Sequence, residues 1–103
     1  MRAAAPGDPS DGSGASATFF GPGGLAVDKS GNLYVADTGN ELIRKVTLRG
    51  VVTTIAGTGV HGFNNGPGLS ATFYDPEDLA IDENGNLYVA DTFNNAIRKI
   101  RIR

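Results

Sequence analysis

Residues 24–49 read GLAVDKSGNLYVADTGNELIRKVTLR, and residues 78–103 read DLAIDENGNLYVADTFNNAIRKIRIR. Both stretches carry apolar, turn and charged residues in the same order, displaced along the chain by the distance from Leu25 to Leu79. The loop before each copy repeats at the same spacing, so that Phe19 and Pro22 correspond to Phe73 and Pro76. A repeat that covers most of a chain indicates one structural unit that occurs twice and buries its apolar surface against its neighbours.

Each copy contains short apolar runs separated by turn residues, which is the pattern of an antiparallel β-meander. In the first copy we expect strands at 25–28, 33–36, 42–48 and 51–56, and in the second at 79–82, 87–90 and from 97 onward. Gly and Asn in the intervening segments tolerate the positive φ angles of tight turns. The strand at 33–36 is apolar on both alternating faces, so it must be covered from both sides.

The pattern predicts a β-propeller. A small sheet with two apolar faces is not stable alone, and packing such sheets around an axis gives a propeller of about four to eight blades. The predicted fold class is therefore all-β, with two four-stranded antiparallel propeller blades that close into a ring by oligomerisation. Its predicted parts are a Gly-, Pro- and Ser-rich segment, a first blade, an inter-blade connection and a second blade without its outer strand, at 1–16, 17–56, 57–76 and 77–103. Residues 1–5 are a candidate for the missing strand, although alanine has little preference for strands.

Charge and composition disfavour several kinds of partner. The chain has 9 Lys and Arg against 11 Asp and Glu, a net charge of −2, which argues against a nucleic-acid or anionic-membrane surface. No apolar run is long enough for a membrane span, and the start MRAAAPGD lacks the apolar region of a signal peptide, so we expect a soluble protein of unassigned compartment. There is no cysteine to form a disulfide. Most basic residues lie in two corresponding stripes: Arg44, Lys45, Arg49, Arg98, Lys99, Arg101 and Arg103.

Two Asp–Arg pairs are the most conspicuous polar residues. Arg44 has the strand parity of the apolar residues that follow it, and Arg98 repeats this in the second copy. An arginine on an apolar face needs a partner, which Asp37 and Asp91 can supply across the intervening turns. We therefore predict structural ion pairs between Asp37 and Arg44 and between Asp91 and Arg98, since a catalytic pair would be expected to differ between the copies.

The loop at 57–76 carries the candidate ligand-binding residues, because little of its first half is shared with the rest of the chain. They are His61, Phe63, Asn64 and Asn65. His61 is the single histidine, so one chain cannot build a multi-histidine metal site. Three copies around an axis could bring three histidines together, although a solvated loop histidine is the simpler interpretation. We predict neither a metal nor a cofactor.

Other polar residues are interpreted as turn residues. Asp28 and Asp82 each precede a Gly-Asn turn, and their surroundings lack the series of oxygen donors of a calcium loop. Thr38 and Thr92 similarly follow strands and have no histidine beside them as a base.

The segments NLYVADTGNELIRK at 32–45 and NLYVADTFNNAIRK at 86–99 resemble NHL repeats. This resemblance implies a six-bladed propeller, which three copies of a two-blade chain would complete, so a homotrimer is favoured over a dimer. It also implies either a two-blade piece of a longer propeller or an engineered two-repeat chain. We expect a non-catalytic structural and interaction module that self-assembles into a ring scaffold. The alternatives are a ligand-, peptide- or RNA-binding propeller face and a metal-dependent, lyase-like site at the ring axis.

Overall fold

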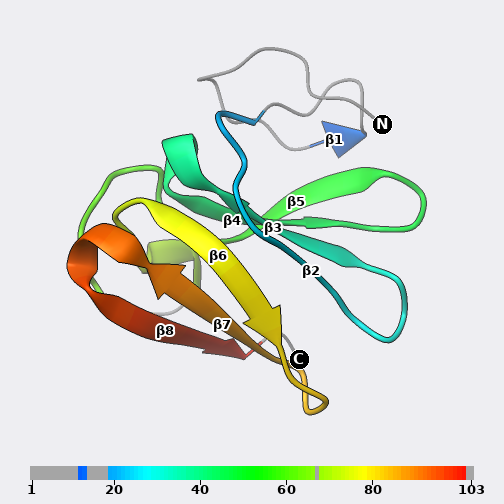
Figure 1. Ribbon diagram of the computed structural model, residues 1–103. Coiled ribbons are helices and arrows are strands. Elements are labelled where there is room, and N and C mark those ends of the chain that lie inside the picture. Colours follow the sequence, from blue (N-terminus) through cyan, green and yellow to red (C-terminus); the bar gives the residue numbers. More distant parts are fainter. Residues whose placement is uncertain (1–11, 14–18, 67, 102–103) are drawn as a thin grey trace.

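The computed structural model describes residues 12–13, 19–66 and 68–101, and this part of the chain is all-β (Figure 1). The strands form two antiparallel sheets, one from each copy of the repeat. The predicted fold class, two antiparallel propeller blades, is confirmed at the level of the single chain. The helices of the described residues are 3-10 turns of three residues, and none of them could cross a membrane.

The first sheet has the strand order β1-β5-β4-β3-β2. Its strands are β1 (Gly12–Ser13), β2 (Leu25–Val27), β3 (Leu33–Asp37), β4 (Leu42–Val46) and β5 (Val51–Ala56). We call β2 to β5 the first blade. β3 is buried along most of its length, as expected for a strand with apolar residues on both faces.

The second sheet has the strand order β6-β7-β8. Its strands are β6 (Pro76–Ile81), β7 (Asn86–Asp91) and β8 (Ala96–Arg101). We call these three strands the second blade. The two blades keep the same register, because Val35 lies opposite Arg44 in the first and Val89 lies opposite Arg98 in the second.

Strand boundaries differ from the expectation by more than one residue in three places. β1 pairs with β5 inside the segment 1–16, for which composition predicts irregular structure. Such pairing uses only backbone groups along a sheet edge, so side-chain composition does not reveal it. β6 begins at Pro76, inside the predicted connection 57–76, because proline is tolerated as the first residue of a strand. β4 ends at Val46, because Thr47 already forms the next turn by accepting a hydrogen bond from Gly50 N.

The two blades pack face to face through one apolar cluster. Its members come from β3, β4 and β5 of the first blade, from β6 and β7 of the second, and from the connection between them. They are Tyr34, Ala36, Ile43, Ala56, Ala71, Phe73, Leu79, Leu87 and Val89. Full burial of a large apolar side chain contributes about 1.5–3 kcal/mol, so this interface is the main source of cohesion between the blades.

The inner strands β2 and β6 approach each other closely at one end (Figure 1). Gly24 N donates a hydrogen bond of 2.8 Å to Glu77 O. A Cβ atom at Gly23 would lie 2.7 Å from Glu77 O, and one at Gly24 would lie 2.6 Å from the Cα atom of Asp78. Only glycine therefore fits at these two positions without a shift of the neighbouring backbone.

Candidate functional site

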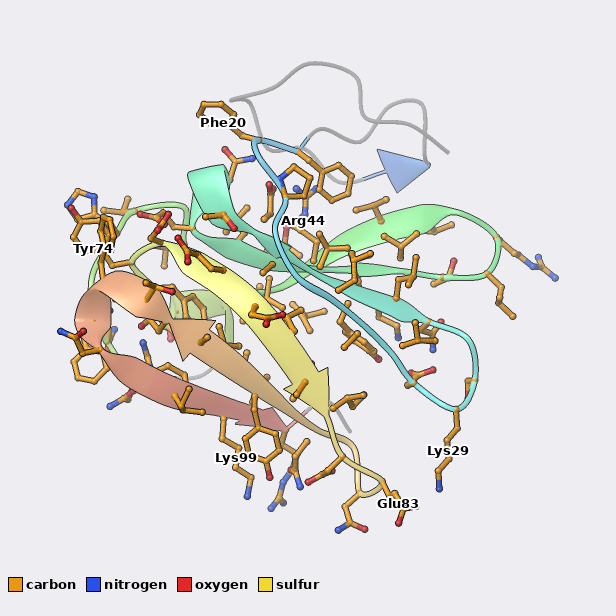
Figure 2. All side chains as sticks on the ribbon, in the orientation of Figure 1. Phe20, Lys29, Arg44, Tyr74, Glu83 and Lys99 are labelled. Atoms are coloured by element: carbon orange, nitrogen blue, oxygen red, sulfur yellow. The ribbon has the colours of Figure 1, made fainter. Side chains whose placement is uncertain are left out.

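The first blade contains a buried ion pair between the end of β3 and β4 (Figure 2). Arg44 Nη1 donates to Asp37 Oδ2 over 2.9 Å, and both side chains are fully buried. The same carboxylate accepts hydrogen bonds from Asn40 Nδ2 at 2.9 Å and from Phe20 N at 2.8 Å. The guanidinium also lies 4.8 Å from the centre of the Phe19 ring. Asp37 thus joins a strand end, a 3-10 turn and the loop before the inner strand.

The second blade repeats this arrangement. Arg98 Nη1 donates to Asp91 Oδ2 over 2.7 Å, and the two side chains are 8% and 0% exposed. Asn94 Nδ2 and Tyr74 N donate to the Asp91 carboxylate at 2.8 Å and 2.7 Å. Because both copies of the ion pair bind the same kinds of turn and loop groups, the pairs build the blades rather than distinguish them.

Arg98 also holds the connection in place. Its Nη1 atom donates to Thr72 O at 2.9 Å, and its Nη2 atom donates to Asn64 O at 2.8 Å. The Phe63 and Phe73 rings lie 4.7 Å and 5.0 Å from the guanidinium carbon. The candidate residues Phe63 and Asn64 therefore contact the structural arginine of the second blade.

The four loop residues predicted to bind a ligand do not share one pocket. The side-chain amide of Asn64 donates to Ser70 O at 3.0 Å and accepts from Gly66 N at 3.2 Å, so it organises its own loop. Asn65 is exposed and lines a groove along β8 together with Phe63. His61 lies apart from them, in an aromatic cluster.

The aromatic cluster consists of His61, Tyr74 and Phe93 (Figure 2 labels Tyr74). The His61 ring stacks on Tyr74 with centroids 4.4 Å apart and planes at 19°, and Phe93 meets Tyr74 edge-on at 5.0 Å. His61 and Phe93 are exposed, and Tyr74 is half-buried. This cluster can offer an aromatic surface to a planar or apolar group.

Acidic residues lie beside the aromatic cluster. Glu41 Oε1 accepts a hydrogen bond of 2.7 Å from Asp75 N, and both residues have positive φ angles, 59° and 62°. Burial raises the pKa of Glu41, and the Asp75 charge acts in the same direction. A side-chain hydrogen bond with Asp75 raises the pKa of Glu77. Among the described residues, no three His, Asp or Glu side chains gather in a way that could hold a metal ion.

Sequence reasoning did not single out the residues that distinguish the second blade at this end. The second copy has Tyr74, Asp75, Glu77 and Phe93 where the first has Phe20, Gly21, Gly23 and Gly39. A position-by-position comparison of the two copies, searching for differences instead of matches, would have found all four.

The opposite end carries two equivalent hairpin turns. In the first blade, Asp28 accepts hydrogen bonds from Ser30 N, from both nitrogens of Asn32 and from Tyr34 Oη, at 2.9–3.0 Å. Burial opposes ionisation of Asp28, but the hydrogen bonds, led by those from Asn32, lower its pKa. Burial and the neighbouring Asp28 raise the pKa of Tyr34 to about 12.

In the second blade, Asp82 accepts the matching hydrogen bonds from Asn84, Asn86 and Tyr88. The bonds from Asn86 contribute most to lowering the pKa of Asp82 to about 2. A cleft of about 650 Å³ separates the two turns. Since N–H and O–H donors satisfy both carboxylate oxygens of each aspartate, the geometry is that of a turn-stabilising residue.

Comparisons with known proteins agree with this architecture. Residues 4–67 match the family model of the teneurin NHL domain, and residues 73–100 match that of the NHL repeat. Three curated relatives illustrate the similarity. "Protein SUPPRESSOR OF QUENCHING 1, chloroplastic" of Arabidopsis thaliana is 44% identical over 87% of this chain, and human "NHL repeat-containing protein 2" is 42% identical over 85% of it. The "Probable peptidyl-alpha-hydroxyglycine alpha-amidating lyase pgal-1" of Caenorhabditis elegans is 30% identical over 76% of it. The chain spans 9%, 13% and 21% of these proteins, respectively.

Two solved structures share the fold. A protein of unknown function from Bacteroides thetaiotaomicron superposes with a TM-score of 0.83 at 37% identity, over 88% of this chain and 24% of its own. An auxiliary nutrient binding protein from the same organism superposes with a TM-score of 0.80 at 31% identity, over 89% and 25%. With family models that match both halves and a fold of two successive blades, the chain belongs to the NHL-repeat family of β-propellers.

Proposed function

We propose that this chain is a two-blade unit that associates with further copies of itself into a closed propeller, and that the ring acts as a binding scaffold without catalysis. One observation carries the proposal: at two pairs of equivalent positions, an apolar residue is buried in one blade and exposed in the other. Leu79 of the second blade is 8% exposed, whereas its counterpart Leu25 is 59% exposed. Conversely, Ile43 of the first blade is 0% exposed, whereas its counterpart Ile97 is 71% exposed.

The two outer faces are complementary because of the repeat. The outer face of the second blade carries Ala80, Tyr88, Ala90 and Ile97, the counterparts of Ala26, Tyr34, Ala36 and Ile43, which face the second blade within the chain. The outer face of the first blade carries Leu25 and Val27, the counterparts of Leu79 and Ile81, which face the first blade. Joining these two faces between copies would repeat the interface that already exists within one chain. Head-to-tail repetition of one interface gives a ring if the rotation closes.

The proposed stoichiometry is three copies. Propellers have about four to eight blades, and three copies of a two-blade chain would supply the six blades that the NHL resemblance implies.

The junction between copies would differ from the junction within the chain at the inner strands. Within the chain, Gly23 and Gly24 allow the close approach to Glu77 and Asp78. On the other side of the second blade, Glu77 and Asp78 themselves occupy the positions of the two glycines. Their side chains would hold the next copy further away, so each junction between copies would open an acidic gap near the axis.

The molar mass in solution tests the proposal most directly. Light scattering should give about three times the 10.7 kDa of the chain. Ile97→Asp, which puts a charge on an outer face, should shift the mass toward the monomer. Val60→Asp is the matched control, since Val60 is also exposed but lies in the connection. A wild-type protein that stays monomeric at high concentration would overturn the ring, and a dimer would overturn the six-blade count.

A second candidate function is the binding of a small ligand or a peptide at the His61, Tyr74 and Phe93 cluster. The exposed ring faces of this cluster, and the fold shared with a nutrient-binding protein, favour it. Thermal-shift screening of the wild type against Tyr74→Ala would test it, with Phe20→Ala as the control from the equivalent position of the first blade. Metal-dependent turnover would instead favour the lyase-like alternative, and salt-sensitive retention of RNA would favour the RNA-binding one.

A further inference from the structure

The aromatic cluster at the loop-bearing end is built together with acidic residues. Phe93 N donates a hydrogen bond of 3.1 Å to Tyr74 O. Thr92 N donates one of 3.3 Å to Asp75 O, so the turn after β7 is fastened to the loop that carries Tyr74. The Glu77 side chain shares a hydrogen bond with the Thr92 side chain and therefore reaches the same turn. Aromatic rings and carboxyl groups thus lie next to each other on one surface.

The carboxyl groups beside the cluster favour a positive charge. Glu41 Oε1 accepts the hydrogen bond from Asp75 N, and the Asp75 side chain is hydrogen-bonded to Glu77. Burial raises the pKa of Glu41, whereas a positive charge on His61 acts in the opposite direction. A cation held at the rings would therefore stabilise the ionised carboxylates and reduce the repulsion between them.

The described part of the chain has no exposed lysine or arginine at this end. Arg44 and Arg98 are buried in their ion pairs. The other described basic residues lie in the hairpin turns of the opposite end or on the adjoining halves of the strands, and they are Lys29, Lys45, Arg49, Lys99 and Arg101. Figure 2 shows Lys29 and Lys99 far from Tyr74. A cation that matches the charge of this surface would come from a partner.

The two buried arginines show how this chain accommodates a guanidinium group. Arg44 pairs with Asp37 and lies 4.8 Å from the centre of the Phe19 ring. Arg98 repeats the combination with its own aspartate and with the Phe63 ring at 4.7 Å. A guanidinium suits such sites because it is planar, stacks on aromatic rings and donates to carboxylates through a fork of N–H groups. The aromatic cluster offers the same two kinds of group on an exposed surface.

We propose that the aromatic cluster and its neighbouring carboxylates bind an arginine side chain in a peptide segment of another protein. The guanidinium stacks on the Phe93 ring, which is 60% exposed, and pairs with Glu77. An open surface gives a free small molecule few contacts, whereas a peptide adds contacts on either side of the arginine. This inference rests on the second candidate function proposed above and specifies its ligand. It uses residues of one chain, so it does not depend on ring formation.

His61 provides the readout, because it is the single histidine of the chain. Its ring-proton NMR signals should shift and saturate when an N-acetylated, C-amidated Gly-Arg-Gly peptide is added to the full chain. The peptide with citrulline in place of arginine keeps the shape but has no charge, so it should bind about tenfold more weakly. The lysine peptide keeps the charge but lacks the planar fork, so it should bind about threefold more weakly.

Two matched pairs of variants locate the site. Phe93→Leu keeps an apolar side chain but removes the ring, and it should weaken binding of the arginine peptide about fivefold. Phe20→Leu removes an exposed ring from the same end of the first blade and should leave binding unchanged. Glu77→Gln should weaken binding about threefold, whereas Glu83→Gln, at an exposed glutamate of the opposite end (Figure 2), should not.

Equal binding of the arginine and citrulline peptides would overturn the proposal. So would equal effects of Glu77→Gln and Glu83→Gln, because the attraction would then come from the overall charge of the protein.

The same titration separates this proposal from the candidate function on which it rests. If a neutral or anionic compound shifts the His61 signals and Tyr74→Ala abolishes that response, while the arginine peptide has no effect, the cluster binds a ligand of another class and the arginine proposal is wrong. If no compound shifts the signals, both the arginine proposal and the candidate binding function are overturned.

Discussion

The first blade presents Phe20, Gly21 and Gly39 at the loop-bearing end of the molecule, where the second blade presents Tyr74, Asp75 and Phe93. The two blades nevertheless keep the same buried ion pair, the same hairpin turn and the same register. Positions that the copies share are therefore those that build a blade. Positions at which they differ are those where a function particular to this chain can lie.

The two blades also differ in which of their equivalent residues are buried. In the pairs Ile43/Ile97 and Leu79/Leu25 the first residue is buried and its counterpart is exposed, whereas Val35 and Val89 are buried in both blades. A substitution at equivalent positions should therefore have equal effects where it tests the blade itself and unequal effects where it tests the interface.

The largest effects should come from removing the ion-pair carboxylates. Asp37→Ala and Asp91→Ala each leave a buried arginine without its carboxylate, which costs about 3–5 kcal/mol of the free energy of unfolding. In Asp91→Ala, Arg98 keeps its hydrogen bonds to two loop carbonyls. Urea unfolding followed by circular dichroism would measure both. A loss below about 1 kcal/mol in either variant would contradict the structural role.

Truncating the two equivalent isoleucines should change the free energy of unfolding by clearly different amounts. Ile43→Ala removes a fully buried side chain and should cost about 2–5 kcal/mol. Ile97→Ala changes an exposed side chain and should stay within about 0.5 kcal/mol under dilute conditions. At high concentration it should also weaken self-association. Equal costs in dilute solution would mean that both blade faces are already covered.

The inner-strand junction offers a third comparison. Gly24→Ala puts a Cβ atom against the Asp78 backbone and should cost about 1–3 kcal/mol through overpacking. Asp78→Gly puts a glycine at the second-blade counterpart of Gly24. This change makes the second blade resemble the first and should lower the concentration at which copies associate. Concentration-dependent sedimentation would show this, and a Gly24→Ala variant as stable as the wild type would refute the close contact.

Acid unfolding should give the smallest difference. The pKa of Asp82 in the folded chain falls from its ordinary 3.8 to about 2, so protonation favours the unfolded chain. The stabilisation is complete well above pH 4 and is lost as pH falls toward 2. Asp82→Asn should therefore flatten the pH dependence of the unfolding midpoint in this window. Asp28→Asn should flatten it less, because burial, which opposes the lowering, is the largest influence on the Asp28 pKa and only a lesser one on the Asp82 pKa. An unchanged slope in Asp82→Asn would contradict the hydrogen-bonded turn.

The local sequence pattern was sufficient to predict the blades, but not the contacts between segments that are far apart in the sequence. The alternation around Arg44, and its repetition around Arg98, predicts strands with an inward arginine that needs an acidic neighbour. Gly23 and Gly24, in contrast, look like ordinary loop glycines, and their contact with Glu77 and Asp78 emerges only from the packing of two sheets.

The candidate loop shows the same limit. His61 and Phe63 are near neighbours in sequence, yet one stacks on Tyr74 and the other on Arg98. The loop around Phe63 is held by hydrogen bonds from Arg98 to backbone carbonyls 26 and 34 residues away in sequence. Such contacts to backbone atoms cannot be predicted from side-chain composition.

The hydrogen bonds from Arg98 to Thr72 O and Asn64 O also indicate where the chain of such a protein can be cut and rejoined. Each loop is fastened to the blade that follows it, through Phe20 N on Asp37 and Tyr74 N on Asp91. The structural unit is therefore a loop together with the blade that follows it. Residues 58–60, which are exposed and precede the fastened part of the connection, are the natural joint for circular permutation or for exchanging blades between propellers.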